Sequence, residues 1–132
     1  MDMKKAILFL ILFICTLNLF SQTIIGKPIK IGILVVAQHD FPDMMNWLDA
    51  KSACDILGTG WRLPTKDELN ILYQNRDKIG GFANSFYWSA TENSNYGAWV
   101  QFFNYGRQYA NDDKNEKYNV RAVRFSSGHW DK

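Results

Sequence analysis

The sequence predicts an α+β domain, because segments with helical spacing come first and segments with strand spacing follow. Between residues 44 and 78, apolar residues recur every three or four positions. After Gly81 the apolar spacing changes to two, and polar loops separate the apolar runs. This order favours an α+β arrangement over a parallel sheet of alternating strands and helices.

The N-terminal segment is typical of a secretory signal peptide. Lys4 and Lys5 precede the apolar run Ala6–Phe20, and the small residue Ser21 follows it. A helix needs about 20 apolar residues to cross ~30 Å of hydrocarbon. The run is shorter than that, so we prefer a signal peptide of residues 1–22 to a membrane anchor. We expect cleavage near Ser21-Gln22, and no stable membrane span after it.

A lipid anchor at Cys15 is disfavoured, because Ile14 stands where lipid-attachment signals have a small residue. The chain has two cysteines, so removal of Cys15 with the signal leaves Cys54 alone. The mature domain therefore cannot close an intrachain disulfide. Its abundant aromatic residues must supply the core instead.

Residues 23–132 have the size of one domain and contain no repeat. The net charge of the whole chain is +2, and no basic tract indicates a nucleic-acid partner. The sequence predicts neither an oligomeric state nor the identity of a ligand.

The first half of this domain contains the expected helices. Residues 23–37 are rich in β-branched residues and predict one or two strands. A helix then begins near Met44, with Asp43 as its cap, and ends at Gly58 and Gly60.

A second helix follows Pro64. Thr65 and Glu68 form a Thr-x-x-Glu capping box, and Leu69 and Leu72 supply the buried stripe. We expect this helix to fade over residues 76–78.

The second half predicts strands joined by polar loops. The expected strands are residues 87–90, 98–103, 107–110 and 119–125, and the loops are residues 91–97, 104–106 and 111–117.

Five segments together carry a family resemblance. They are Asn46-Trp47-x-x-Ala50-x-x-x-Cys54, Gly60-Trp61-Arg62-Leu63-Pro64-Thr65-Lys66-x-Glu68-Leu69, Tyr87-Trp88-Ser89-Ala90-Thr91-Glu92, Ala98-Trp99-Val100 and Tyr118-x-Val120-Arg121-Ala122-Val123-Arg124. In this order they resemble the Lcl C-terminal domain family, named after the C-terminal domain of the Legionella collagen-like protein. They are also similar to the Fibrobacter major paralogous domain. The match covers about residues 47–125.

The resemblance implies a C-type-lectin-like fold, with two helices packed on a twisted, mostly antiparallel sheet and long polar loops. The family occurs on bacterial exported and surface proteins, and adhesion to glycans is the role suggested for some members. Fold does not fix function, so the ligand has to be sought in the residues themselves.

Most motif residues are expected to be structural. Trp47, Trp61, Trp88 and Trp99 lie in periodic apolar segments, and Cys54 lies on the buried stripe of a helix. The arginines Arg62, Arg121 and Arg124 are expected to pair with carboxylates such as Glu68 and to cover aromatic rings. The alternative is that these arginines form a site for an anion or an acidic sugar.

The polar loops near residues 92–97 and 104–116 are the candidate ligand site. A sugar presents C–H patches that stack on aromatic rings and hydroxyl groups that need hydrogen-bond partners. The candidates of these types are Asn93, Asn95, Tyr96, Tyr105, Arg107, Tyr109, Asn111, Asp112 and Asp113. The alternative is that the Asn and Asp residues only form turns.

No metal or other cofactor is predicted. Glu92, Asp112, Asp113 and Glu116 could offer oxygens to calcium. However, the Glu-Pro-Asn and Trp-Asn-Asp signatures of calcium-dependent sugar binding do not occur. His39 and His129 lie far apart without cysteine neighbours, so a zinc site is also unsupported.

We therefore predict an exported, non-enzymatic domain that binds a glycan or another surface ligand. The first alternative is a structural component of the cell envelope that binds protein. The second is a carbohydrate-active enzyme with Glu92 and Asp112 as its carboxylate pair. Formylglycine-generating enzymes share the broad fold, but their chemistry uses two thiols, and only Cys54 would remain here.

Overall fold

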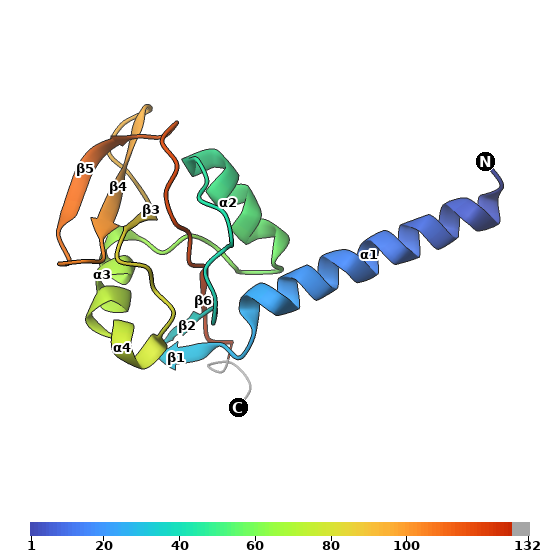
Figure 1. Ribbon diagram of the computed structural model, residues 1–132, viewed down its shortest axis with the longest axis horizontal. Coiled ribbons are helices and arrows are strands. Elements are labelled where there is room, and N and C mark those ends of the chain that lie inside the picture. Colours follow the sequence, from blue (N-terminus) through green and yellow to red (C-terminus); the bar gives the residue numbers. More distant parts are fainter. Residues whose placement is uncertain (128–132) are drawn as a thin grey trace.

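A computed structural model of the chain describes residues 1–127, as a domain from which one long helix projects (Figure 1). His129, considered above as a zinc ligand, lies outside the described residues. The helices are α1 (Met3–Ile25), α2 (Trp47–Ile56), α3 (Lys66–Gln74) and α4 (Arg76–Ile79). The strands are β1 (Ile29–Ile31), β2 (Leu34–Val36), β3 (Phe86–Glu92), β4 (Gly97–Phe102), β5 (Gln108–Asp113) and β6 (Val123–Phe125).

The strands form two antiparallel sheets, ordered β1-β2-β6 and β3-β4-β5. Strand β6 therefore returns from the end of the domain to pair with β2 near its beginning. The segment before β6 lies between the start of α2 and strand β3, because Met45 pairs with Tyr118 and Tyr87 pairs with Asn119. The expected α+β architecture is confirmed.

Two apolar clusters fill the domain. One joins α2 to one face of β3 and β4 and includes Trp47, Cys54 and Trp88, all nearly or fully buried. The other joins α3 to β2 and to the opposite face of β3, and includes Leu69 and Leu72. Strand β3 is thus covered on both faces, which explains why Tyr87 and Trp88, adjacent in this strand, are both fully buried.

The two main helices differ in how well the sequence marks their start. Helix α3 begins with the expected capping box: Thr65 accepts from the Glu68 N–H at 3.2 Å, and Glu68 accepts from the Thr65 N–H at 2.9 Å. Helix α2 begins three residues after the expected position. Its cap is Asn46, which accepts from the Asp49 N–H at 2.9 Å, and the expectation for Asp43 is wrong.

The strand boundaries also required correction. Strand β5 continues to Asp113, through residues expected to form a loop, because Gly97 and Ala98 of β4 pair with Asp113 and Asp112. The final strand is shorter than expected and covers only Val123–Phe125. Residues 118–122 before it make backbone hydrogen bonds to residues 37–45 and to β3, through isolated bridges instead of a ladder.

Helix α1 is apolar and long enough to cross a membrane, and it is almost entirely exposed in the described structure. Length and composition are consistent with a signal sequence or an anchor. The helix extends beyond the expected signal segment, because Thr23–Ile25, expected at the start of a strand region, form its last turn.

Candidate functional site

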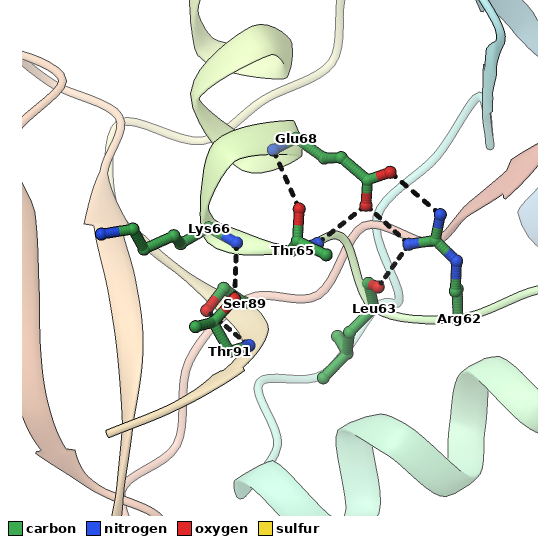
Figure 2. A network of polar contacts seen from close by, with 7 residues as sticks. All are labelled: Arg62, Leu63, Thr65, Lys66, Glu68, Ser89 and Thr91. Carbon is green, nitrogen blue, oxygen red and sulfur yellow. Dashed lines mark hydrogen bonds and ion pairs between the residues drawn. The ribbon is translucent and has the colours of Figure 1, made fainter.

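The Trp-Arg-Leu-Pro-Thr segment is organised by an ion pair between Arg62 and Glu68 (Figure 2). The two guanidinium nitrogens donate to the two carboxylate oxygens at 2.6 and 2.9 Å, and Arg62 also donates to the Leu63 carbonyl. Burial raises the pKa of Glu68, but the hydrogen bonds from Arg62 and Thr65 outweigh it and hold that pKa below its usual range. The structure thus contains the pairing of Arg62 with Glu68 that the sequence predicts.

The same network joins the start of α3 to β3 (Figure 2). The Lys66 N–H donates to the Thr91 hydroxyl at 2.9 Å, and the Thr91 N–H donates to the Ser89 hydroxyl at 3.1 Å. The Ala90 N–H donates to the Pro64 carbonyl at 2.7 Å. The Trp-Arg-Leu-Pro-Thr segment and the Tyr-Trp-Ser-Ala-Thr-Glu segment therefore hold each other in place.

Arg121 is a charged residue that lies buried inside the domain. Its side chain donates to Asp40 at 2.6 Å and to the carbonyls of Ala37 and Gly80 at 3.2 Å. Tyr87 donates to the same carboxylate. Burial, followed by the nearby Asp40, raises the pKa of Tyr87, so its hydroxyl stays protonated as a donor.

The other motif residues also serve the core. Arg124 lies over the ring of Trp61, and Trp99, which is half-buried, is covered by Lys66. Burial raises the pKa of the Cys54 thiol to about 12, so it stays protonated at neutral pH.

The polar loops converge at one end of sheet β3-β4-β5. The loop between β3 and β4 meets the turn after β5 because Gly97 pairs with Asp113 across the two strands. Between them lies a hollow of about 440 Å³, which we call the loop groove. It is lined by Ser94, Tyr96, Gly97, Asp113 and Asn115.

Lys114 braces the loop groove. Its ammonium donates to Glu92 at 2.7 Å and to the Asn95 carbonyl at 3.0 Å. Its backbone N–H donates to the Tyr96 carbonyl at 3.0 Å, and its own carbonyl accepts from the Trp47 N–H at 3.0 Å. The ammonium also lies 4.3 Å from the centroid of the buried Trp47 ring. Both loops are thereby tied to the first turn of α2.

Turn chemistry shapes the rim of the loop groove. Ser94 accepts from the Gly97 N–H at 3.1 Å, and Asp113 accepts from the Asn115 N–H at 2.9 Å. Some polar side chains are therefore used to form turns, as the alternative prediction stated. Tyr96 remains 83 % exposed, so its ring is open to solvent at the rim.

The structure separates the candidate residues into two groups. Asn93, Asn95, Tyr96 and Asp113 belong to the loop-groove end. Tyr105 and Arg107 lie in the β4–β5 hairpin at the opposite end, about 17 Å away along the six residues of β4. The candidate residues do not meet on one surface.

The hairpin end carries an aromatic surface, formed by Phe86, Phe102, Tyr105 and Tyr109. Phe86 and Phe102 face each other across the strands at 4.6 Å, and Tyr105 contacts Phe102 edge-on at 4.9 Å. The Tyr105 and Tyr109 hydroxyls share a hydrogen bond of 2.7 Å, and Arg107 lies over the Tyr109 ring. Gly106 has φ 87°, and a side chain there would collide with the ring of Tyr73.

The remaining candidates, Asn111 and Asp112, lie within β5. Asp112 accepts from the Tyr118 hydroxyl at 3.4 Å. Burial raises the pKa of Asp112, and burial together with that carboxylate raises the pKa of Tyr118 to about 12.

Glu92 and Asp112 do not form a facing pair. They lie on the strands that flank β4, both opposite Ala98, so their backbones are two strand spacings or about 10 Å apart. Lys114 binds the first carboxylate and Tyr118 contacts the second. This arrangement gives no support to paired acid and nucleophile carboxylates.

A second hollow, of about 300 Å³, lies beside the Arg62–Glu68 pair, with Leu63, Ala90 and Phe125 among its lining residues. The polar groups of that ion pair bind one another, and Lys51, Asp55 and Thr65 supply the other polar groups of the lining. Within residues 1–127, no three His, Cys, Asp or Glu side chains are grouped so as to hold a metal ion.

Of the loop-groove residues, Tyr96 and Asp113 were predicted from the sequence, whereas Ser94, Asn115 and Lys114 were not. Ser94 and Asn115 stand inside the loops that the sequence marks as polar, so their position was the available signal. The role of Lys114 depends on the approach of Trp47, which is far away in the sequence and gives no local signal.

Comparisons with known proteins agree with this fold. The model of the Lcl C-terminal domain matches residues 31–124. No curated protein sequence matches the chain. Among solved structures, the C-type-lectin-like snake protein EMS16, an antagonist of the collagen receptor integrin α2β1, superposes with a TM-score of 0.58 at 9 % identity, covering 76 % of this chain and 98 % of that one.

Botrocetin superposes with a TM-score of 0.59 at 11 % identity, and with 0.57 in its complex with the von Willebrand factor A1 domain. The coverage is again 76 % of this chain and 98 % of the other. At such low identity these similarities establish the C-type-lectin-like fold alone.

Proposed function

Because the chain belongs to the Lcl C-terminal domain family, we propose that it is an exported, non-enzymatic domain that recognises a glycan in the loop groove. The observation that carries this proposal is the convergence of two polar loops on one hollow with an exposed tyrosine at its rim. The tyrosine ring offers a face for sugar C–H groups, and Ser94, Asp113 and Asn115 offer hydrogen-bonding groups.

The bracing by Lys114 supports this proposal. A binding loop that must be ordered by its ligand loses affinity through the entropy of ordering. Here, the hydrogen bonds of Lys114 to Glu92, Asn95 and Tyr96 hold the loop before a ligand arrives.

A glycan array, probed with the full-length chain in mild detergent, tests the proposal. Tyr96→Ala is the site variant and Tyr105→Ala is the matched control, since both are exposed tyrosines in loops at opposite ends of one sheet. We expect Tyr96→Ala to weaken glycan binding about 2- to 10-fold, the range of one aromatic contact, and Tyr105→Ala to leave it unchanged. Equal losses in both variants, or no glycan bound by the folded wild type, would contradict the proposal.

Protein binding at the aromatic surface of the hairpin is the second candidate function. Tyr105 is 57 % exposed and rests on partly buried rings, an arrangement enriched at protein interfaces. EMS16 and botrocetin are described with protein partners, an integrin and the von Willebrand factor A1 domain. Under this alternative, Tyr105→Ala weakens binding to a cell-envelope partner and Tyr96→Ala does not.

We further propose that α1 exports the domain and is cleaved near Ser21-Gln22. The basic Lys4 and Lys5 before an apolar run support this role. Ile24 is 4 % exposed and belongs to the core, so cleavage upstream of it would leave the domain intact. N-terminal sequencing of the protein recovered outside the cytoplasm identifies the bond, and an N-terminus beyond Ile24 would contradict this position.

A further inference from the structure

Helix α1 joins the domain without a flexible linker. Ile24 is buried in the core, and the carbonyls of Ile24 and Ile25 accept from the N–H groups of His39 and Gln38 at 3.2 and 2.9 Å. Gly26 ends the helix with φ 54° against the side chain of Gln38, which accepts from the Lys27 N–H at 2.7 Å. The direction of α1 is therefore fixed relative to the domain.

The last turns of α1 also contact the α2 side of the domain. The ring of Phe20 lies 6.4 Å from that of Phe41, and the Ser21 hydroxyl donates to the Ile56 carbonyl at 3.4 Å. Around this contact lies a hollow of about 230 Å³, which we call the collar. Its lining is apolar apart from Asp43, and consists of Phe20, Phe41, Pro42, Asp43, Met45, Ala53 and Ile56.

The length of α1 brings the collar to the surface of any membrane that the helix enters. The apolar part of the helix before the domain contacts, Ala6–Leu19, reaches only about 21 Å at ~1.5 Å per residue. The hydrocarbon core of a bilayer is ~30 Å thick. This apolar segment alone cannot span the hydrocarbon core, although the whole of α1 could, so either the bilayer thins or the last turns of α1 and the collar enter the interface.

We propose that, while α1 remains attached, the domain docks on a lipid bilayer through the collar. The exposed apolar side chains of Pro42 and Ile56 then continue the apolar surface of α1 into the interface. Ile56 is 57 % exposed in the described structure, which leaves its side chain free for lipid contact.

Docking of this kind fixes the orientation of the domain. Figure 1 shows α1 leaving beside α2 and β1, on the opposite side of the domain from sheet β3-β4-β5. The loop groove belongs to that distant sheet. The predicted cleavage bond near Ser21-Gln22 lies inside the docked segment, so docking and cleavage compete for the same residues.

Fluorescence quenching in vesicles tests the docking. The full-length chain with Cys15→Ala is reconstituted in vesicles of phosphatidylethanolamine and phosphatidylglycerol that contain a head-group nitroxide lipid. A polarity-sensitive thiol dye is attached at Ile56→Cys or Pro42→Cys in the collar, or at Tyr96→Cys in the loop groove. Buried Cys54, whose pKa is raised to about 12, does not compete for the dye. The natural Cys15, labelled in the unsubstituted chain, reports insertion of α1.

We expect several-fold stronger quenching, and blue-shifted emission, at the two collar positions than at Tyr96→Cys. The two collar variants act independently, so a folding defect in one leaves the other as a test. Equal quenching at all three positions with α1 inserted would mean that the domain moves freely, and would overturn the proposal. Collar positions with no quenching would mean that the domain stands away from the bilayer, which also overturns it.

Discussion

Two ion pairs of nearly equal length stabilise different regions of this molecule. Arg121 lies 2.6 Å from Asp40 in the interior, and Lys114 lies 2.7 Å from Glu92 beside the loop groove. The side chain of Arg121 is fully buried, whereas that of Glu92 is 51 % exposed. Burying an ion costs several kcal/mol that its partners must offset, while an exposed pair contributes about 0–1 kcal/mol. The contribution of each pair to stability therefore depends on its burial and not on its length.

Because they differ in burial, the two pairs have different structural roles. Arg121 holds together segments around Ala37, Gly80 and Asp40 that no strand pairing joins. Lys114 holds only the loops of the groove against Trp47. We expect the interior pair to control folding and the outer pair to control binding.

The largest effect should follow Arg121→Met, which leaves Asp40 in a partly buried site without its counter-charge. We expect the free energy of unfolding to fall by about 3–5 kcal/mol, the range for breaking a buried pair. Urea denaturation followed by tryptophan fluorescence measures it. The double variant Arg121→Met/Asp40→Asn should recover part of the loss, because the uncompensated charge is gone. A single variant as stable as the wild type would contradict the role of burial.

An intermediate effect should follow Glu68→Gln, since the Arg62–Glu68 pair is only partly shielded from solvent. We expect a loss of about 1 kcal/mol at pH 7, discounted for that exposure. The folded-state pKa of Glu68 is lowered, so its contribution is present above the unfolded pKa and disappears as pH falls through the folded value. The gap between wild type and variant should therefore narrow below about pH 4.5. A gap that stays constant down to pH 3 would show that the charge of Glu68 is not involved.

The same contrast explains what sequence alone could predict. The capping box of α3 and the Arg62–Glu68 pair lie within one short segment, so spacing and chemistry identified both. The burial of Trp88 and Cys54 followed from apolar periodicity. These features depend on neighbours in the chain or on which face of an element is apolar.

The candidate site was harder to predict, because it depends on strand register. Asp113 pairs with Gly97 only because the register between β4 and β5 shifts along the strands. Residues 111–113 are polar, so their sequence predicts a loop and not the end of a strand. The same register places Tyr105 at the far end of the sheet from Tyr96. The candidate residues predicted from the sequence therefore belong to two surfaces, the loop groove and the aromatic surface of the hairpin, which only the fold distinguishes.

The smallest effect on stability should follow Lys114→Met, although its effect on binding should be clear. The variant keeps the side-chain stem over Trp47 but loses the bonds to Glu92 and to the Asn95 carbonyl. We expect no measurable shift in the urea midpoint, because the pair is exposed on the Glu92 side.

Glycan affinity should instead fall about 2- to 10-fold in Lys114→Met, the range expected when a ligand must order a loop that was previously held. Lys117→Met, an exposed lysine in the same turn, is the matched control and should change neither quantity. Isothermal titration with a glycan identified on the array measures the affinity. If Lys114→Met lowers stability as strongly as Arg121→Met, burial is not what distinguishes the two pairs. If Lys114→Met leaves the glycan affinity unchanged, ligand binding in the loop groove does not depend on the hydrogen bonds of Lys114.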